Sequence, residues 1–189
     1  VKCCTQNGVR GGSATVHFPI WHQEIEDIIV LKNNKGSEDN RVRKLDYSIQ
    51  LSKLFYERFI NNEDITLFSP HEVPELYDAW GSSEFDDLYE KAERKLSVKK
   101  TKINAQELFF DILKERAETG RIYIMNIDHC NTHSSFKDKV YMSNLCQEIT
   151  LPTTPIQHID DKEGEIALCI LSAINLGLLT DIDLSLIHI

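Results

Sequence analysis

The chain has 189 residues, of which 41% are hydrophobic and 27% charged, so it is long enough to bury one sizeable core. Its net charge of −9 excludes non-specific binding to nucleic acid or to an anionic membrane, because both require a basic surface. Nucleotide binding is not excluded, since a few local amides or cations suffice for it.

Further features bear on where the protein works and on its extent. No apolar run reaches bilayer-spanning length and no basic-then-apolar leader is visible, so we expect a cytoplasmic protein. Five cysteines, an odd number without framework spacing, fit a reducing cytosol better than a disulfide scaffold. The start at Val1 and the apolar ending predict a single partial domain, cut from a longer chain, and leave open whether the tail over residues 184–189 is native.

The first part of the chain predicts a loop, a strand and two helices. Residues 4–14 form a Gly-rich segment that suits either a structural turn or a loop close to a ligand, but it is not a Walker loop. Residues 15–18 predict a short strand that Pro19 ends. Apolar residues at helical spacing then predict helices over residues 21–31 and 48–60.

The middle of the chain continues this alternation. Residues 65–68 predict a strand, and a short helix begins at residues 73–77, where a proline occupies a tolerated first-turn position. Residues 86–95 and 105–118 predict helices, the second of which Gly120 ends. The segment 121–127 then predicts a buried strand. Alternating strands and helices favour an α/β architecture with mostly parallel pairing.

The segment Asp128-His129-Cys130-Asn131-Thr132-His133-Ser134 invites a zinc interpretation, because a cysteine lies between two histidines. A closed structural site would lack further ligands, so a polar loop at the end of a strand explains the segment better, and we expect no metal. Residues 165–172 predict the last clear strand of the chain.

Residues 143–151 carry the chemically richest pattern. In an extended segment Asn144, Cys146 and Glu148 point the same way, which lines up an amide, a thiol and a carboxylate. The opposite face holds the residues that would anchor the segment: Leu145, Gln147 and Ile149. Three unlike reactive groups at this spacing suit a site for a small polar molecule. Taken alone, however, the pattern is better explained by a half-buried strand with one core cysteine.

An ordered set of motifs across residues 1–177 favours a reactive site over a strand with a core cysteine. The motifs are QNGVRGG (6–12), LKNN (31–34), NRVR (40–43), DY (46–47), LFSP (67–70), GRIY (120–123), DHCNTH (128–133), SNLCQEI (143–149) and GEIALC (164–169). Together they resemble the catalytic barrel of the large subunit of a class I ribonucleotide reductase. One such motif is weak evidence, but nine in the same order are specific.

The resemblance implies a fold and a set of catalytic residues. The fold would be a ten-stranded α/β barrel, with residues 143–151 as a finger loop in its centre. Cys146 would become a thiyl radical that takes the 3′ hydrogen atom of a ribonucleotide. Glu148 would be the general base on the 3′ hydroxyl, and Asn144 would hydrogen-bond the ribose hydroxyls. Cys169, otherwise best explained as a core cysteine, would be half of a dithiol that reduces the 2′ carbon.

The resemblance also implies partners and regulation. Residues 1–15 would form the specificity loop, with Gln6 and Arg10 reaching the substrate under the control of bound dNTP or ATP effectors. Substrates would be ribonucleoside diphosphates, and the external reductant thioredoxin or glutaredoxin. A separate metal-containing small subunit would supply the radical, so no cofactor is expected within this chain. The full-length protein would be a homodimer. Cys3, Cys4 and Cys130 receive no role.

Two alternatives stay open at this point. The chain could be a non-catalytic or truncated remnant of such an enzyme, although a remnant has little reason to keep Asn144, Cys146, Glu148 and Cys169 together. It could also be a cobalamin-dependent or glycyl-radical reductase, although the sequence around Cys146 and Cys169 looks more like class I. The partner of Cys169 is expected before Val1, and the phosphate loop, the relay tyrosines and a cysteine pair after Ile189. The isolated chain is therefore expected to be inactive.

Overall fold

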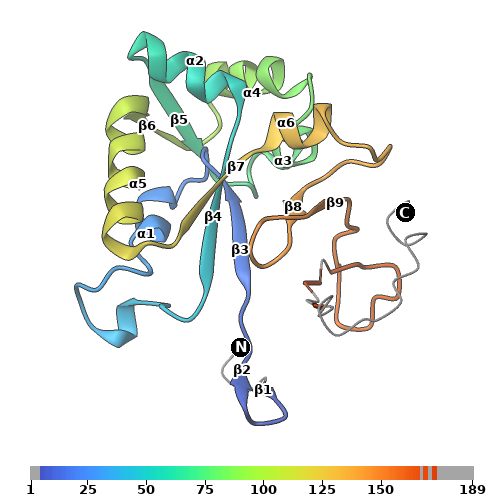
Figure 1. Cartoon of the computed structure of the whole chain (residues 1–189). Coiled ribbons are helices and arrows are strands. Elements are labelled where there is room, and N and C mark those ends of the chain that lie inside the picture. Colours follow the sequence, from blue (N-terminus) through green and yellow to red (C-terminus); the bar gives the residue numbers. More distant parts are fainter. Residues whose placement is uncertain (1–4, 167, 170–171, 174–189) are drawn as a thin grey trace.

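The computed structural model describes the chain except for residues 1–4, 167, 170–171 and 174–189 (Figure 1). Its centre is a parallel sheet of three strands in the order β3 (Thr15–Pro19), β4 (Asp46–Leu51) and β7 (Ile122–Asn126). All six residues of β4 are buried, as expected for a parallel strand covered on both faces. Residue 48 lies in register with residue 17 on one side and residue 123 on the other.

Helices connect and cover these strands. The short helices α1 (Ile25–Ile29) and η1 (Glu38–Asn40) lie between β3 and β4, and α2 (Lys53–Asn61) follows β4. The longest helix, α5 (Ala105–Thr119), leads into β7 and packs against that strand and against α2 (Figure 1). No helix in the described part of the chain is both long and apolar enough to cross a membrane.

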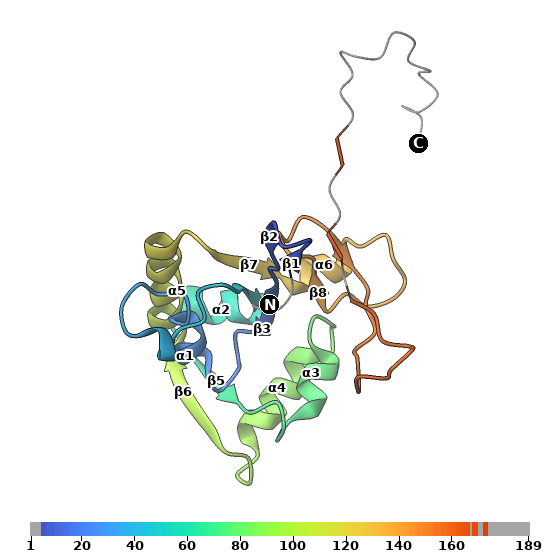
Figure 2. The ribbon, with the colours of Figure 1, turned by 90° about the horizontal axis from the view of Figure 1, so that it is seen from below.

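A second, antiparallel pair of strands lies beside the parallel sheet. It consists of β5 (Asp64–Phe68) and β6 (Lys100–Asn104), and the chain between them forms α3 (Pro74–Ala79) and α4 (Phe85–Arg94). Figure 2 shows α3 and α4 as a group beside the sheet. The two parts share an aromatic core. The ring centroids of Trp80 and Phe85 lie 4.5 Å apart, and those of Trp21 and Trp80 lie 6.0 Å apart.

Two hairpins and one helix complete the described chain. The hairpin of β1 (Thr5–Gln6) and β2 (Arg10–Gly11) extends from the foot of β3 (Figure 1). Helix α6 (Ile127–Thr132) follows β7 directly, and β8 (Met142–Ser143) pairs with β9 (Thr150–Leu151). The result is a mixed α/β structure, and within the described residues its strands do not close into a barrel.

The sequence predicted most of these elements, and four expectations differ from the structure. The helix expected over residues 48–60 begins only at Lys53, because residues 46–51 pair with parallel strands on both sides. The polar loop expected at residues 128–134 is largely helix α6, and strand β6 was not predicted. The strand expected at 165–172 is not formed at residues 165, 166, 168, 169 and 172, which are irregular, and residues 167, 170 and 171 lie outside the described residues.

Candidate active site

The candidate site is the loop that joins β8 to β9. The loop is closed by one backbone hydrogen bond, in which Asn144 N donates to Ile149 O at 3.3 Å, and the side-chain Oδ1 of Asn144 accepts a further bond from Ile149 N at 3.0 Å. Gln147 donates its backbone N–H to Asn144 O at 3.2 Å and has a φ of 63°. The extended conformation expected for residues 143–151 is therefore wrong at the tip, where a left-handed residue reverses the chain.

Three side-chain hydrogen bonds hold this loop against the parallel sheet. Thr15 in β3 donates through its hydroxyl to Leu145 O, and Ser48 in β4 donates to Gln147 Oε1 at 2.6 Å. Gln147 Nε2 in turn donates to Ile124 O in β7 at 2.7 Å. Each strand of the sheet thus makes one bond to the residue just before or just after Cys146. The expectation that Gln147 anchors the segment agrees with these contacts.

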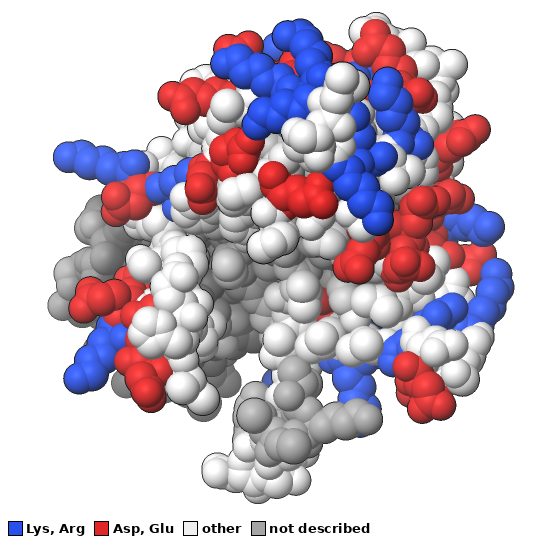
Figure 3. Space-filling view, turned by 180° about the vertical axis from the view of Figure 1, so that it is seen from behind, with Lys and Arg blue, Asp and Glu red and all other residues white. Residues whose placement is uncertain are grey.

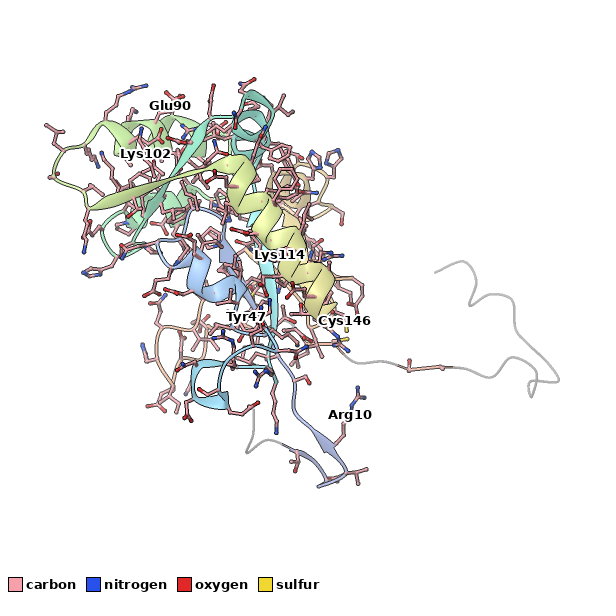
Figure 4. All side chains as sticks on the ribbon, turned by 90° about the vertical axis from the view of Figure 1, so that its left-hand side faces the viewer. Arg10, Tyr47, Glu90, Lys102, Lys114 and Cys146 are labelled. Atoms are coloured by element: carbon pink, nitrogen blue, oxygen red, sulfur yellow. The ribbon has the colours of Figure 1, made fainter. Side chains whose placement is uncertain are left out.

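The loop and the segment after it bring together the residues singled out by the sequence. The Sγ of Cys169 lies 3.3 Å from Glu148 Oε1, although 21 residues separate them. Asn144 lies near both groups and takes part in shifting their pKa values. Cys146 is exposed, at the tip of the loop (Figure 4). A thiol, a carboxylate, an amide and a second thiol therefore converge on one side of the molecule.

The carboxylate and the thiol of this cluster have complementary charge states. The pKa of Glu148 is lowered, first by its own backbone N–H, then by the Asn144 amide, with the Cys169 thiol contributing less. The pKa of Cys169 is raised, first by its hydrogen bond to Glu148 and then by desolvation. At neutral pH the arrangement favours an ionised acceptor beside a protonated thiol.

Asn144 has an unused hydrogen-bond donor. Its side chain is 2% exposed, and its Oδ1 accepts from Ile149 N, which fixes the orientation of the amide. Its Nδ2 has no hydrogen-bond partner within the described residues, although it lies near enough to Glu148 to help lower the pKa of that carboxyl. Buried donors are nearly always paired, so this nitrogen lacks the partner that such a group normally has.

The two residues of the expected specificity loop lie elsewhere. Gln6 and Arg10 pair in the β1–β2 hairpin, and Arg10 is exposed. Figure 4 shows Arg10 on that projecting hairpin, separated from Cys146 in this view. The described residues therefore do not bring Arg10 into the cluster around the thiol.

A pocket of about 370 Å³ lies beside the loop, between it and α6. It is lined by these residues: Ile124, Met125, Asn126, His129, Cys130, His133, Ser134, Gln147 and Thr150. His129 and His133 are four residues apart, and their ring centroids are separated by 5.4 Å. Among the described residues, no group of three or more His, Cys, Asp or Glu side chains is arranged to hold a metal.

A larger charged hollow of about 710 Å³ lies among α2, α4, β5 and β6. Both arginines that line it are paired with carboxylates: Arg58 forms two bonds of 2.7 Å to Glu93, and Arg94 forms one to Glu90. Figure 4 places Glu90 and Lys102 at the end of the molecule opposite Cys146. On the face shown in Figure 3, basic and acidic side chains are likewise interspersed. We find no selective anion site here.

The anchors Thr15 and Ser48 were missed by the sequence analysis. Neither belongs to a recognisable local pattern, and residues 48–51 were assigned to a helix. The only local signal was the alternation of polar and apolar residues over residues 46–51, in which Ser48 lies completely buried between Tyr47 and Ile49. Such a residue must find a hydrogen-bond partner, but the sequence does not say where.

The sequence of this chain matches a known protein family. The family described as "Ribonucleotide reductase, barrel domain" matches residues 1–185. The chain is 57% identical to the ribonucleoside-diphosphate reductase subunit alpha of Buchnera aphidicola subsp. Schizaphis graminum over 187 residues, 96% of this chain and 24% of that protein. It is 55% identical to the same subunit of Haemophilus influenzae over 188 residues, 97% of this chain and 25% of that protein.

More distant relatives match the same region. The large subunit of Arabidopsis thaliana is 39% identical over 171 residues, 89% of this chain and 20% of that protein. The chain thus spans about a quarter of the length of the bacterial relatives it matches. The family match covers nearly the whole sequence, including the loop around Cys146 and the segment that ends at Cys169. The chain belongs to the barrel-domain family of ribonucleotide reductases.

Proposed function

We propose that this chain is the part of a ribonucleoside-diphosphate reductase that carries the reacting thiol. The observation that supports this most directly is the convergence of Glu148, Cys169 and Asn144 beside the exposed Cys146 on one anchored loop. These are the group types that radical reduction of a ribose requires: a hydrogen-atom acceptor, a base, a donor to hydroxyl groups and a reducing thiol.

Cys146 is proposed to act as a thiyl radical. Its sulfur takes the hydrogen atom from the 3′ carbon, which forms an S–H bond, breaks a C–H bond and leaves the radical on the sugar. The two bonds are of similar strength, so the transfer is reversible and the thiyl radical is regenerated at the end. Exposure of Cys146 at the tip of the loop leaves its sulfur accessible to a substrate.

Glu148 and Asn144 are proposed to handle the ribose hydroxyls. Glu148 has a lowered pKa, so it is present as a carboxylate that can accept the proton of the 3′ hydroxyl. Asn144 has a buried Nδ2 with no partner among the described residues, and this donor suits a ribose oxygen.

Cys169 is proposed to supply reducing equivalents. Its raised pKa keeps it as a thiol beside Glu148. With a second cysteine it gives two electrons and two hydrogens, so that a ribonucleotide and a dithiol become a deoxyribonucleotide, water and a disulfide. Thioredoxin or glutaredoxin then reduces the disulfide, and a metal-containing small subunit supplies the radical to Cys146.

The wider assembly follows from the same proposal. The strands of this chain form part of a ten-stranded barrel with residues 143–151 at its centre, and the working enzyme is a cytoplasmic homodimer. The β1–β2 hairpin contributes Gln6 and Arg10 to substrate selection under dNTP or ATP effectors. The exposure of Arg10 on a projecting hairpin supports a role in contacts beyond this chain.

The substitution Cys146→Ala tests this function in a full-length alpha subunit that contains this segment. We expect deoxynucleotide formation with the small subunit to be abolished, because alanine has no S–H bond to exchange. Effector binding is expected to remain, since Cys146 makes none of the loop's anchoring bonds among the described residues. Product formation is measured by chromatography and effector binding by calorimetry.

The matched control is Cys130→Ala, which removes another free thiol, half-buried in α6. This variant is expected to keep its turnover. Retained turnover in Cys146→Ala would overturn the assignment of the reacting thiol.

A further inference from the structure

The residue after the reacting cysteine has an unusual backbone. Gln147 has a φ of 63°, and among the described residues only Asn7 and Asn62 share a positive φ without being glycine. Asparagine tolerates this conformation because its short side chain bonds locally, but glutamine has no such advantage. A strained residue persists only where its surroundings hold it in place.

The surroundings of Gln147 hold it by its side chain. Its Nε2 donates to Ile124 O at 2.7 Å, and its Oε1 accepts from Ser48 Oγ at 2.6 Å. A main-chain carbonyl can only accept, so the bond to Ile124 fixes which end of the amide faces which strand. One amide thereby bridges β4 and β7, which are neighbours in the sheet.

This bridge determines where the thiol lies. Cys146 makes no hydrogen bond of its own within the described part of the chain, whereas the residues on both sides of it are bonded to the sheet. On one side Leu145 O accepts from Thr15, and on the other the Gln147 amide spans two strands. The backbone at Cys146, from which the thiol projects, is therefore held by its neighbours.

We propose that Gln147 is a positioning residue, whose side-chain amide fixes the left-handed turn and so directs Cys146 Sγ toward the substrate. This inference rests on the proposed role of Cys146 as the reacting thiol. Among the described residues, the side chains of Gln147 and Ser48 form hydrogen bonds with each other and with Ile124 O, and none with Asn144, Cys146, Glu148 or Cys169. Their loss should therefore change how often the thiol reaches its reactive position, and not how the substrate binds.

Two substitutions of Gln147 distinguish the effect of its side-chain hydrogen bonds from the effect of its backbone conformation. Gln147→Met keeps the length of the side chain and removes both hydrogen bonds. Gln147→Gly removes the side chain and relieves the positive φ, since glycine adopts this conformation without strain. If only the turn mattered, Gly would support full activity. If the amide positions the thiol, both variants lose kcat.

The experiment measures kcat and KM in the full-length alpha subunit that contains this segment, with its small subunit. We expect kcat to fall about 10- to 100-fold in both variants, as for a reacting group misplaced by about 1 Å. KM is expected to stay within about threefold of its original value, because positioning acts after substrate binding.

Ser48→Ala provides an independent variant that removes a single hydroxyl from a rigid strand. It should lower kcat less than Gln147→Met, and the double variant should be no worse than Gln147→Met alone, because both changes break one bridge. The matched control is Gln106→Met in α5, which removes a comparable bond to Phe59 O of 2.8 Å, distant from the loop. This control should keep its kcat.

The outcomes separate this inference from the proposed function. Full kcat in Gln147→Met and Ser48→Ala, with Cys146→Ala inactive, would overturn the positioning role and leave the function standing. Turnover in Cys146→Ala would overturn the function itself. A rise in KM with unchanged kcat would assign Gln147 to substrate binding and also contradict the inference.

Discussion

Glu148 and Cys169 shift each other's pKa in opposite directions. The hydrogen bond of 3.3 Å stabilises the carboxylate and the protonated thiol together, so each group is held in one charge state over a wider pH range. A lowered carboxyl pKa keeps Glu148 ionised down to a lower pH than usual. The base form is thus lost only when the pH falls through that lowered pKa.

The substitution Glu148→Gln tests this pairing. Without the negative charge, the main cause of the raised pKa of Cys169 is removed, so its thiolate forms at lower pH and reacts faster. We expect alkylation of Cys169 at neutral pH to accelerate severalfold, measured by mass spectrometry of its peptide in the reduced protein. Glu57→Gln on α2 is the control, and an unchanged rate in Glu148→Gln would contradict the pairing.

At the residue scale, the site residues remain a prediction, whereas the geometry expected for them differs from the structure. Alternation along an extended segment 143–151 placed Asn144, Cys146 and Glu148 on one face, but the chain reverses at Gln147. No spacing rule predicts contact between Glu148 and Cys169 across 21 residues. That contact depends on how the chain after β9 folds back, which is a tertiary property.

At the scale of elements, capping explains why the sequence located α5 so well. Asn104 accepts hydrogen bonds from the backbone of residues 106 and 107 at 3.0 and 3.2 Å, and Gly120 ends the helix with a φ of 69°. Both signals are local, so they can be read from sequence. Strand β4 lacks such signals, and its pairing with β3 and β7 overrode the helical spacing of residues 48–51.

Removal of the cap should have a measurable effect. Asn104→Ala is expected to lower the free energy of unfolding by about 1 kcal/mol, because two N–H groups of the first turn lose their acceptor. Urea unfolding of the chain, followed by circular dichroism, measures this loss. Asn104→Asp keeps an acceptor and should be close to neutral; equal losses in both variants would contradict a capping role.

At the scale of the whole molecule, packing between distant segments distinguishes two similar glycines. Gly81 and Gly120 both have positive φ, 78° and 69°. A Cβ at Gly81 would lie 2.8 Å from Ile127 Cγ1 and from Asn131 Nδ2 in α6, whereas a Cβ at Gly120 would meet nothing within 4 Å. Gly81 therefore lets the loop after α3 approach α6.

Alanine at the two positions should separate backbone strain from crowding. Gly120→Ala is expected to destabilise the chain by about 1–2 kcal/mol, the strain of a left-handed residue. Gly81→Ala adds crowding of about 1–3 kcal/mol to the same strain. Urea midpoints of both variants measure the difference, and equal midpoints would show that α6 moves aside freely.

The sequence shows which residues are aromatic, but it does not predict that they form one shared core. Trp21, Trp80 and Phe85 come from three separate segments, and their ring contacts join the parallel sheet to the α3–α4 group. The sequence identified each as apolar, but not that they would meet. Whether the strands close into a barrel depends equally on segments beyond the described residues.

The three bonds that hold the loop also have a consequence for folding. They span 130, 99 and 23 residues of the chain, so two of them join parts that are far apart before folding. Closing such long loops is entropically unfavourable until other contacts have formed. We therefore expect the sheet to assemble before the loop is fixed, so that the cysteine reaches its final position late in folding.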